Sequence, residues 1–147
     1  MIRVIFAVAI TLLSFGLHAN SETIERSIEN RDLWLEQATS LIQQGDFDTL
    51  ERSCKATLGE AMHRDVEELL NPLRAALNDR GAIYIDKIDR VEMGRTFDQH
   101  VYAAYYGQRE FIFYSFIFAK LENGWQLYSI DYADSLEGLS PSVNSQG

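Results

Sequence analysis

The 147-residue sequence is poor in cysteine and in basic residues, and each shortage excludes something. Cys54 is the single cysteine, so no disulfide can form within one chain and the core must hold the fold together. There are 13 Lys and Arg residues against 22 Asp and Glu residues, a formal charge of −9. Nucleic acids and anionic membrane surfaces select basic patches, so neither is an expected partner.

Motifs that bind metals or phosphates, or that present a nucleophile, are also missing. The sequence has no Gly-rich phosphate loop, no nucleophile elbow and no Cys-x-x-Cys pair. His63 could share a helix face with Glu60 and Glu67, but the second histidine of a zinc-binding helix is absent. We therefore predict no metal and no cofactor.

What is present begins with a segment typical of a removable signal peptide, residues 1–19. Arg3 precedes an uncharged apolar stretch, and the small residue Ala19 ends the segment. The stretch is shorter than the roughly 20 residues that a membrane helix needs. We expect cleavage after Ala19, export to the bacterial periplasm or the cell exterior, and no membrane attachment afterwards.

The rest of the chain is short enough for one domain. We predict a single α+β domain over residues 20–134. Residues 135–147 are rich in Ser, Gly and Asn, contain Pro141 and show no hydrophobic period. This composition predicts a mobile C-terminal tail.

Apolar residues at helical spacing predict helices in the first half of the domain. Residues 22–44 carry one apolar stripe between Ser21, which can cap a helix start, and Gly45, which can end a helix. A short second helix should follow and run through Cys54, with Asp48 in its first turn.

A third helix is predicted from Thr57. Thr57 and Glu60 have the Ser/Thr-x-x-Glu spacing of a capping box, and an apolar stripe follows them. Pro72 lacks a backbone N–H, so it should kink or divide this helix near Asn71.

After Gly81, β-branched and aromatic residues predict strands. The four expected strands cover about residues 82–93, 96–106, 110–121 and 124–133. Gly107 and Asn123-Gly124 mark hairpin turns, the second with a type I′ signature. The third strand is apolar on both alternating faces, which predicts a central strand covered on both sides.

The first of these strands carries charges of both signs. They are Asp86, Lys87, Asp89, Arg90 and Glu92. Such a strand is expected at a sheet edge, where charge discourages unwanted pairing. A contact surface for a basic partner protein is the alternative interpretation.

Helices followed by a strand meander predict an α+β fold, with N-terminal helices packed on a curved antiparallel sheet of about four strands. The final hairpin, residues 111–132, has a long apolar strand, a short turn and a strand that opens on Trp125. It resembles the nuclear-transport-factor-like superfamily, also called cystatin-like or ketosteroid-isomerase-like. The resemblance implies a cone-shaped fold with a pocket between sheet and helix, which different members use for catalysis, ligand binding or dimer contacts. Fold alone does not choose among these uses.

Aromatic residues concentrate on the predicted strands and could line such a pocket. The predicted ligand-pocket residues are Tyr84, Tyr102, Tyr114, Trp125 and Tyr128. In the alternative interpretation, these rings only hold the sheet to the helices.

A cofactor-free isomerase would need an acid or base in an apolar cavity and a hydroxyl donor opposite it. Asp131 is the candidate base, and His100, Tyr84 or Tyr102 is the candidate donor. Asp131 shares an alternation face with Trp125, which leaves its burial undecided. We therefore predict no catalytic site and keep Asp131 and His100 as candidates only.

The leading hypothesis is an exported, non-enzymatic binding or interaction domain with an aromatic-lined pocket for a small apolar ligand or a peptide. The first alternative is a protein-partner role, as an immunity protein, an inhibitor or a subunit of an envelope assembly. The second is a cofactor-free isomerase or dehydratase. Two points stay open: homodimerisation, and whether Cys54 is a buried apolar residue or a reactive thiol.

Overall fold

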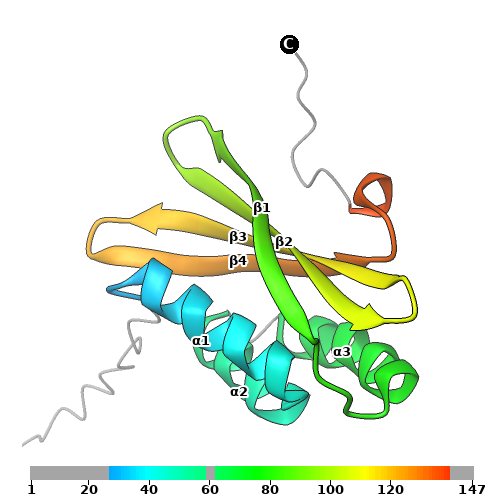
Figure 1. The fold of residues 1–147 in the computed structure, drawn as a ribbon. Helices are drawn as coiled ribbons and strands as arrows, with labels where there is room; N and C mark the ends of the chain where they lie inside the picture. The colour runs from blue at the N-terminus through cyan, green and yellow to red at the C-terminus, as the bar shows by residue number, and fades with distance from the viewer. Residues whose placement is uncertain (1–26, 59–61, 140–147) are drawn as a thin grey trace, which may run out of the picture.

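The structure is a computed structural model that describes residues 27–58 and 62–139, so the predicted signal peptide lies outside the described residues. Three helices form one layer and a four-stranded antiparallel sheet forms the other (Figure 1). This arrangement confirms the predicted α+β fold class. No helix within the described ranges is long and apolar enough to span a membrane.

The first helix, α1, spans Arg31–Gln44. The side chain of Asn30 caps it by accepting a hydrogen bond from the Leu33 N–H at 3.0 Å. Gly45 ends it with a φ of 72°, as predicted. A Cβ at Gly45 would lie 2.1 Å from the Asp79 carbonyl oxygen, so both the backbone conformation and the close approach require glycine.

The predicted start of this helix at residue 22 is wrong for the residues that the structure describes. Residues 27–30 lie outside any helix, and Ile28 forms an antiparallel bridge with Trp125. The Ile28 N–H donates to the Trp125 carbonyl at 2.5 Å, and the Trp125 N–H donates back at 3.0 Å. The apolar side chain of Ile28 fits a helical stripe and a sheet edge equally well, and the two backbone hydrogen bonds favour the sheet.

The second helix, α2, spans Phe47–Thr57, and the third, α3, spans His63–Leu77. The capping box predicted at Thr57 is wrong, because Thr57 is the last residue of α2. Its hydroxyl donates to carbonyl oxygens of its own helix, at residues 53 and 54. Pro72 lies inside α3 and does not divide it, so of the two predicted effects of this proline, a kink or a division, the division is wrong.

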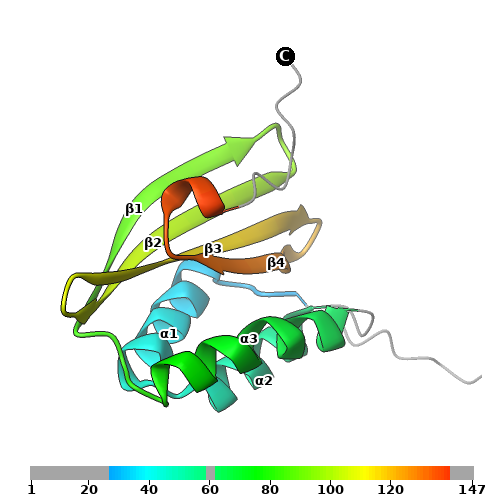
Figure 2. The ribbon, with the colours of Figure 1, turned by 90° about the vertical axis from the view of Figure 1, so that its right-hand side faces the viewer.

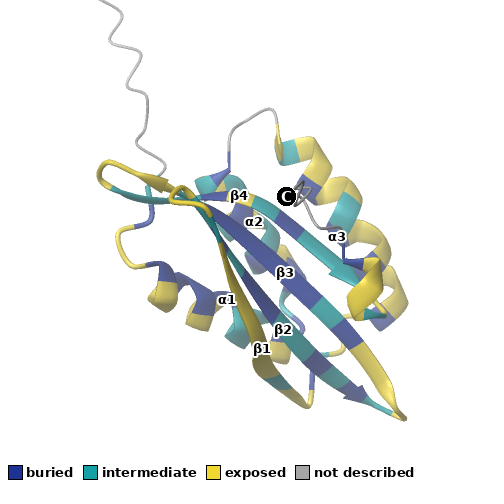
Figure 3. Cartoon of the chain, turned by 90° about the horizontal axis from the view of Figure 1, so that it is seen from above, coloured by how far each residue is buried: buried dark blue, intermediate teal, exposed yellow. Residues whose placement is uncertain are grey.

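The strands lie within two residues of their predicted bounds and pair in sequence order. They are β1 Tyr84–Met93, β2 Phe97–Gly107, β3 Glu110–Leu121 and β4 Gly124–Ala133. As predicted, β1 is an edge strand, and most of its residues are exposed (Figure 3).

The hairpin turns differ from their predicted chemistry. Leu121 pairs with Gly124, so Glu122 and Asn123 form the last loop, and neither has a positive φ. Positive φ angles, of 52° and 66°, occur instead at Gln108 and Arg109 in the β2–β3 turn. Two consecutive positive φ angles are the pattern of a type I′ turn, here made by residues without glycine's freedom.

The sheet is covered on both faces at β3. Alternate residues from Ile112 to Phe118 are buried toward the helices, while Ser115 and Ile117 are buried on the other face. After β4, a short 3₁₀ helix, η2 Leu136–Gly138, lies on the side of the sheet away from the helices (Figure 2). Leu139 is also buried. Residues 135–139 therefore belong to the folded domain, and the rest of the predicted tail lies outside the described residues.

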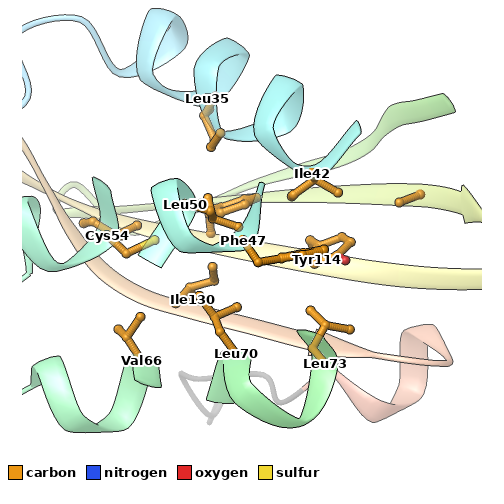
Figure 4. Packing of buried hydrophobic residues seen from close by; sticks show 14 of the residues in the cluster. Leu35, Ile42, Phe47, Leu50, Cys54, Val66, Leu70, Leu73, Tyr114 and Ile130 are labelled. Carbon is orange, nitrogen blue, oxygen red and sulfur yellow. The ribbon is translucent and has the colours of Figure 1, made fainter. Parts of the chain in front are cut away.

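Side chains from all three helices meet the sheet in one core (Figure 4). Cys54 lies in this core and is fully buried. Burial raises the pKa of its thiol to about 12, with a further contribution from the Glu51 carboxylate. Cys54 is therefore a buried apolar residue, the first of the two interpretations above.

Candidate functional site

The structure does not bring the five predicted pocket residues together. Tyr84 and Tyr128 are exposed, and they lie on the sheet face away from the helices. Tyr102 and Tyr114 are cross-strand partners on the opposite, helix-facing side. Tyr114 is fully buried, and its hydroxyl lies 2.6 Å from that of Tyr106. These residues therefore do not line one shared pocket between sheet and helices, and Tyr114 instead forms part of the core.

The candidate catalytic residues are also separated. Asp131 pairs with Ser115 on the outer face of the sheet, and its carboxylate accepts a hydrogen bond from the Tyr132 N–H at 2.8 Å. His100 pairs with Phe116 on the helix-facing side and is fully buried. Because successive residues point to opposite faces, Asp131 and His100 cannot act on one substrate atom. Asp131 and His100 therefore do not form the acid–base pair that was considered for an isomerase.

A buried charged cluster lies where α1 begins against the sheet. Its centre is Asp98 of β2, which is only 2% exposed. Nη1 of Arg31, the first residue of α1, donates to Oδ2 of Asp98. Arg90 of β1 donates to the same carboxylate from Nε, at 3.1 Å to Oδ1, and from Nη2, at 3.0 Å to Oδ2. Two guanidinium groups from different layers of the fold therefore share one carboxylate.

Two titratable groups of this cluster have shifted pKa values. Burial alone would raise the pKa of Asp98, but the hydrogen bond from Arg90 and the charge of Arg31 outweigh it and lower the pKa. Burial lowers the pKa of His100. The positive charges of Lys87 and Arg31 lower this pKa further, whereas the Asp98 carboxylate raises it. His100 Nε2 lies 3.2 Å from Asp98 Oδ2, but neither ring nitrogen has a well-aligned hydrogen-bond partner.

Beside this cluster, the strand ends form a cleft of about 450 Å³. The cleft is at the end of the sheet that carries the β1–β2 and β3–β4 turns. It is lined by Arg90, Glu92, Gly94, Arg95, Thr96, Phe97, Asp98, Lys120 and Trp125. We call this cavity the strand-end cleft. Its volume is within the range of small-molecule sites.

The aromatic wall of the strand-end cleft is the Trp125 side chain, which is held in place by residues 28 and 31. Trp125 is bridged to Ile28 through the backbone, and the Arg31 guanidinium stacks 4.4 Å from the centre of its ring. Gly124 permits this bridge, because a Cβ there would lie 2.7 Å from the Ile28 carbonyl oxygen. Trp125 is thus the one predicted pocket residue that lines this cleft.

The charges in the strand-end cleft do not balance. Arg90 pairs with both acidic residues, reaching Glu92 at 3.0 Å and Asp98 at 3.0 Å. The exposed side chains of Arg95 and Lys120 make no ion pair or side-chain hydrogen bond within residues 27–58 and 62–139. The cleft therefore presents unpaired positive charge on a protein of net negative charge.

Sequence reasoning missed this site because its residues come from separate parts of the chain. Arg90 was interpreted as an edge charge or as part of a contact surface for a partner protein, and nothing in its spacing pairs it with Arg31. The described part of the chain contains no group of three or more His, Cys, Asp or Glu side chains arranged to hold a metal ion.

Comparisons with known proteins give one similarity in fold. No protein-family model matches the sequence, and no curated protein matches it. Among solved structures, a cystatin-like protein from Ruminococcus gnavus ATCC 29149 matches with a TM-score of 0.45 and 18% sequence identity. The match covers 71% of this chain and 37% of that protein, so this chain spans little more than a third of its length. The likeness concerns the fold alone.

Proposed function

We propose that this chain is a non-enzymatic ligand-binding domain and that the strand-end cleft is its binding site. The observation that carries the proposal is the composition of the cleft. It combines the aromatic ring of Trp125 with the unpaired cations Arg95 and Lys120, and it lies beside the buried Arg31–Asp98–Arg90 cluster. Because Arg31, Asp98 and Arg90 already hold one another, the wall is preorganised before a ligand arrives. Preorganisation reduces the entropy lost on binding.

A role without catalysis is supported by the position of the reactive groups. Asp131 and His100 face opposite sides of the sheet, and the Cys54 thiol is buried with a raised pKa. Asp98 is occupied by two guanidinium groups, which hold it as a charged structural anchor rather than a free base.

We also propose that the domain works after export, in the periplasm or outside the cell. The support is the signal-peptide pattern of residues 1–19. A fold held by its core and by ion pairs, with Cys54 as its single thiol, needs no oxidative folding after export.

The binding proposal is tested by titrating isotope-labelled protein, from residue 20 onward, with water-soluble fragments of neutral, anionic and cationic character. Amide resonances are followed in two-dimensional NMR spectra. We expect the shifts caused by binding fragments to concentrate on residues 94–98, Lys120 and the Trp125 indole N–H, because these residues line the cleft.

The control is a variant with a filled cleft, Thr96→Tyr, since Thr96 is exposed and lines the cavity. It should lose these shifts. The same change at Thr39, which lines a smaller crevice between α1 and β1, should leave them unchanged. If fragments bind equally well to the Thr96→Tyr variant, or bind only elsewhere, the cleft is not the site.

A further inference from the structure

The strand-end cleft also shows what kind of ligand it would hold, and this step rests on the proposed function. We infer that its ligand is a small organic anion with a flat apolar body. Two features of the cleft carry the inference: the charge left over after internal pairing, and the aromatic surface beside that charge.

The charge argument begins with the two carboxylates in the cleft. Asp98 is bound by Arg31 and Arg90, and Glu92 is bound by Arg90. An arriving anion therefore meets carboxylates that are already compensated. The side chains of Arg95 and Lys120 remain available to it, because they are exposed and have no partner among the residues described.

The position of these two cations favours an anion that reaches both. Arg95 lies in the β1–β2 turn, and Lys120 lies on β3 beside that turn, where its backbone N–H donates to the Thr96 carbonyl at 2.7 Å. Both side chains line the same cavity. Hydrogen bonds between charged donors and a carboxylate or phosphate are about twice as strong as neutral ones.

The apolar argument comes from the indole ring of Trp125, which lines the cleft, whereas the ring of Phe97 packs on Tyr128 on the other face of the sheet. Lys120 and Trp125 are cross-strand partners, so a cation and an indole ring lie side by side. A ligand with an acidic group and a flat apolar body would contact both at once. The protein has a net charge of −9, so its overall electrostatic field does not attract anions. Binding of an anion would therefore depend on the local contacts in the cleft.

A matched pair of probes separates charge from shape. Indole-3-acetate carries the acidic group, and indole-3-acetamide has nearly the same shape without the charge. We expect the acetate to bind the cleft on the order of tenfold more tightly, as one charge-assisted contact would give. Its affinity should fall as salt is added. Affinities are measured by calorimetry, and the site is identified from the NMR shifts of residues 94–98.

The charge requirement is tested with the double variant R95Q/K120Q, which should bind the acetate and the amide equally. A control variant, R52Q/R109Q, removes two exposed cations outside the cleft and should keep the preference for the acetate. Circular dichroism verifies that both variants are folded.

Each outcome has a distinct meaning. If the amide binds the cleft as tightly as the acetate, the anion inference is wrong and the binding site stands. Retention of the preference in R95Q/K120Q also overturns the inference. If neither probe shifts the cleft resonances and the wider fragment set also leaves them unchanged, the proposed function fails with it.

Discussion

His100 is a fully buried imidazole whose two ring nitrogens lack well-aligned hydrogen bonds. Its surroundings combine the carboxylate of Asp98 with the cations Arg31 and Lys87 and the ring of Phe118. Burial dominates among these influences and lowers the pKa below the ordinary value of 6.5. The neutral form of His100 is therefore the one that the folded state favours.

This shift predicts a loss of stability in mild acid. Below about pH 6.5 the unfolded chain binds a proton at this imidazole more readily than the folded chain does, so the free energy of unfolding falls. Above that pH the contribution is fully present. Urea unfolding of the wild type at pH 7.5 and pH 5.5 should show the loss, and His100→Gln should reduce it. His63→Gln should retain the loss. If the free energy of unfolding falls equally in all three proteins between pH 7.5 and pH 5.5, His100 is not the cause.

At the scale of an element, α3 forms in spite of an interior proline. The helix runs from His63 to Leu77 with Pro72 near its C-terminal end. Its buried residues Val66, Leu70, Leu73 and Leu77 pack into the core. The burial of this stripe outweighs the missing hydrogen bond at Pro72, whereas the sequence pattern alone predicted a kink or a division of the helix.

Replacing Pro72 should therefore stabilise the protein. Pro72 is exposed, so Pro72→Ala costs no packing and restores a backbone donor within the helix. We expect the free energy of unfolding to rise by about 1 to 3 kcal/mol, measured in urea. Asn71→Ala, at the neighbouring exposed position, should change it by only a few tenths of a kcal/mol. A loss of stability in Pro72→Ala would mean that the proline is needed for the native helix geometry.

At the scale of the whole molecule, the buried cluster connects the two layers. Arg31 belongs to α1 and Asp98 to β2, and they are 67 positions apart in the sequence. Beside them, Ile28 is bridged to β4. The start of the helical layer is thus attached to the sheet at both edges of the strand-end cleft.

Breaking this connection should be costly. Asp98→Asn leaves Arg31 buried without a full counter-charge, and removing one partner of a buried ion pair costs about 3 kcal/mol or more. Asp32 also pairs with Arg31, at 3.0 Å, but its side chain is 74% exposed. Asp32→Asn should therefore cost less than about 1 kcal/mol. Equal losses in the two variants, measured by urea unfolding at neutral pH, would show that burial does not control the strength of this cluster.

The candidate site could be predicted only in part. Trp125 was expected in a pocket and does line the strand-end cleft, but Tyr84, Tyr102, Tyr114 and Tyr128 do not line it. Periodicity identifies which residues of a strand share a face, but the sequence does not show where a helix stops covering that face. Helix α1 begins at Arg31, nine residues later than predicted, so among the described residues no helix covers the strand ends that form the cleft.

Local sequence patterns were enough to predict the order of the elements, the approximate bounds of the strands and the edge position of β1. These follow from local periodicity, turn residues and charge, which act between neighbours along the chain. Local patterns did not predict that Ile28 joins the sheet, that Pro72 stays within a continuous helix or that Arg31 contacts Asp98. Each of these depends on contacts between residues far apart in the sequence, whose burial and hydrogen bonds outweigh local preference.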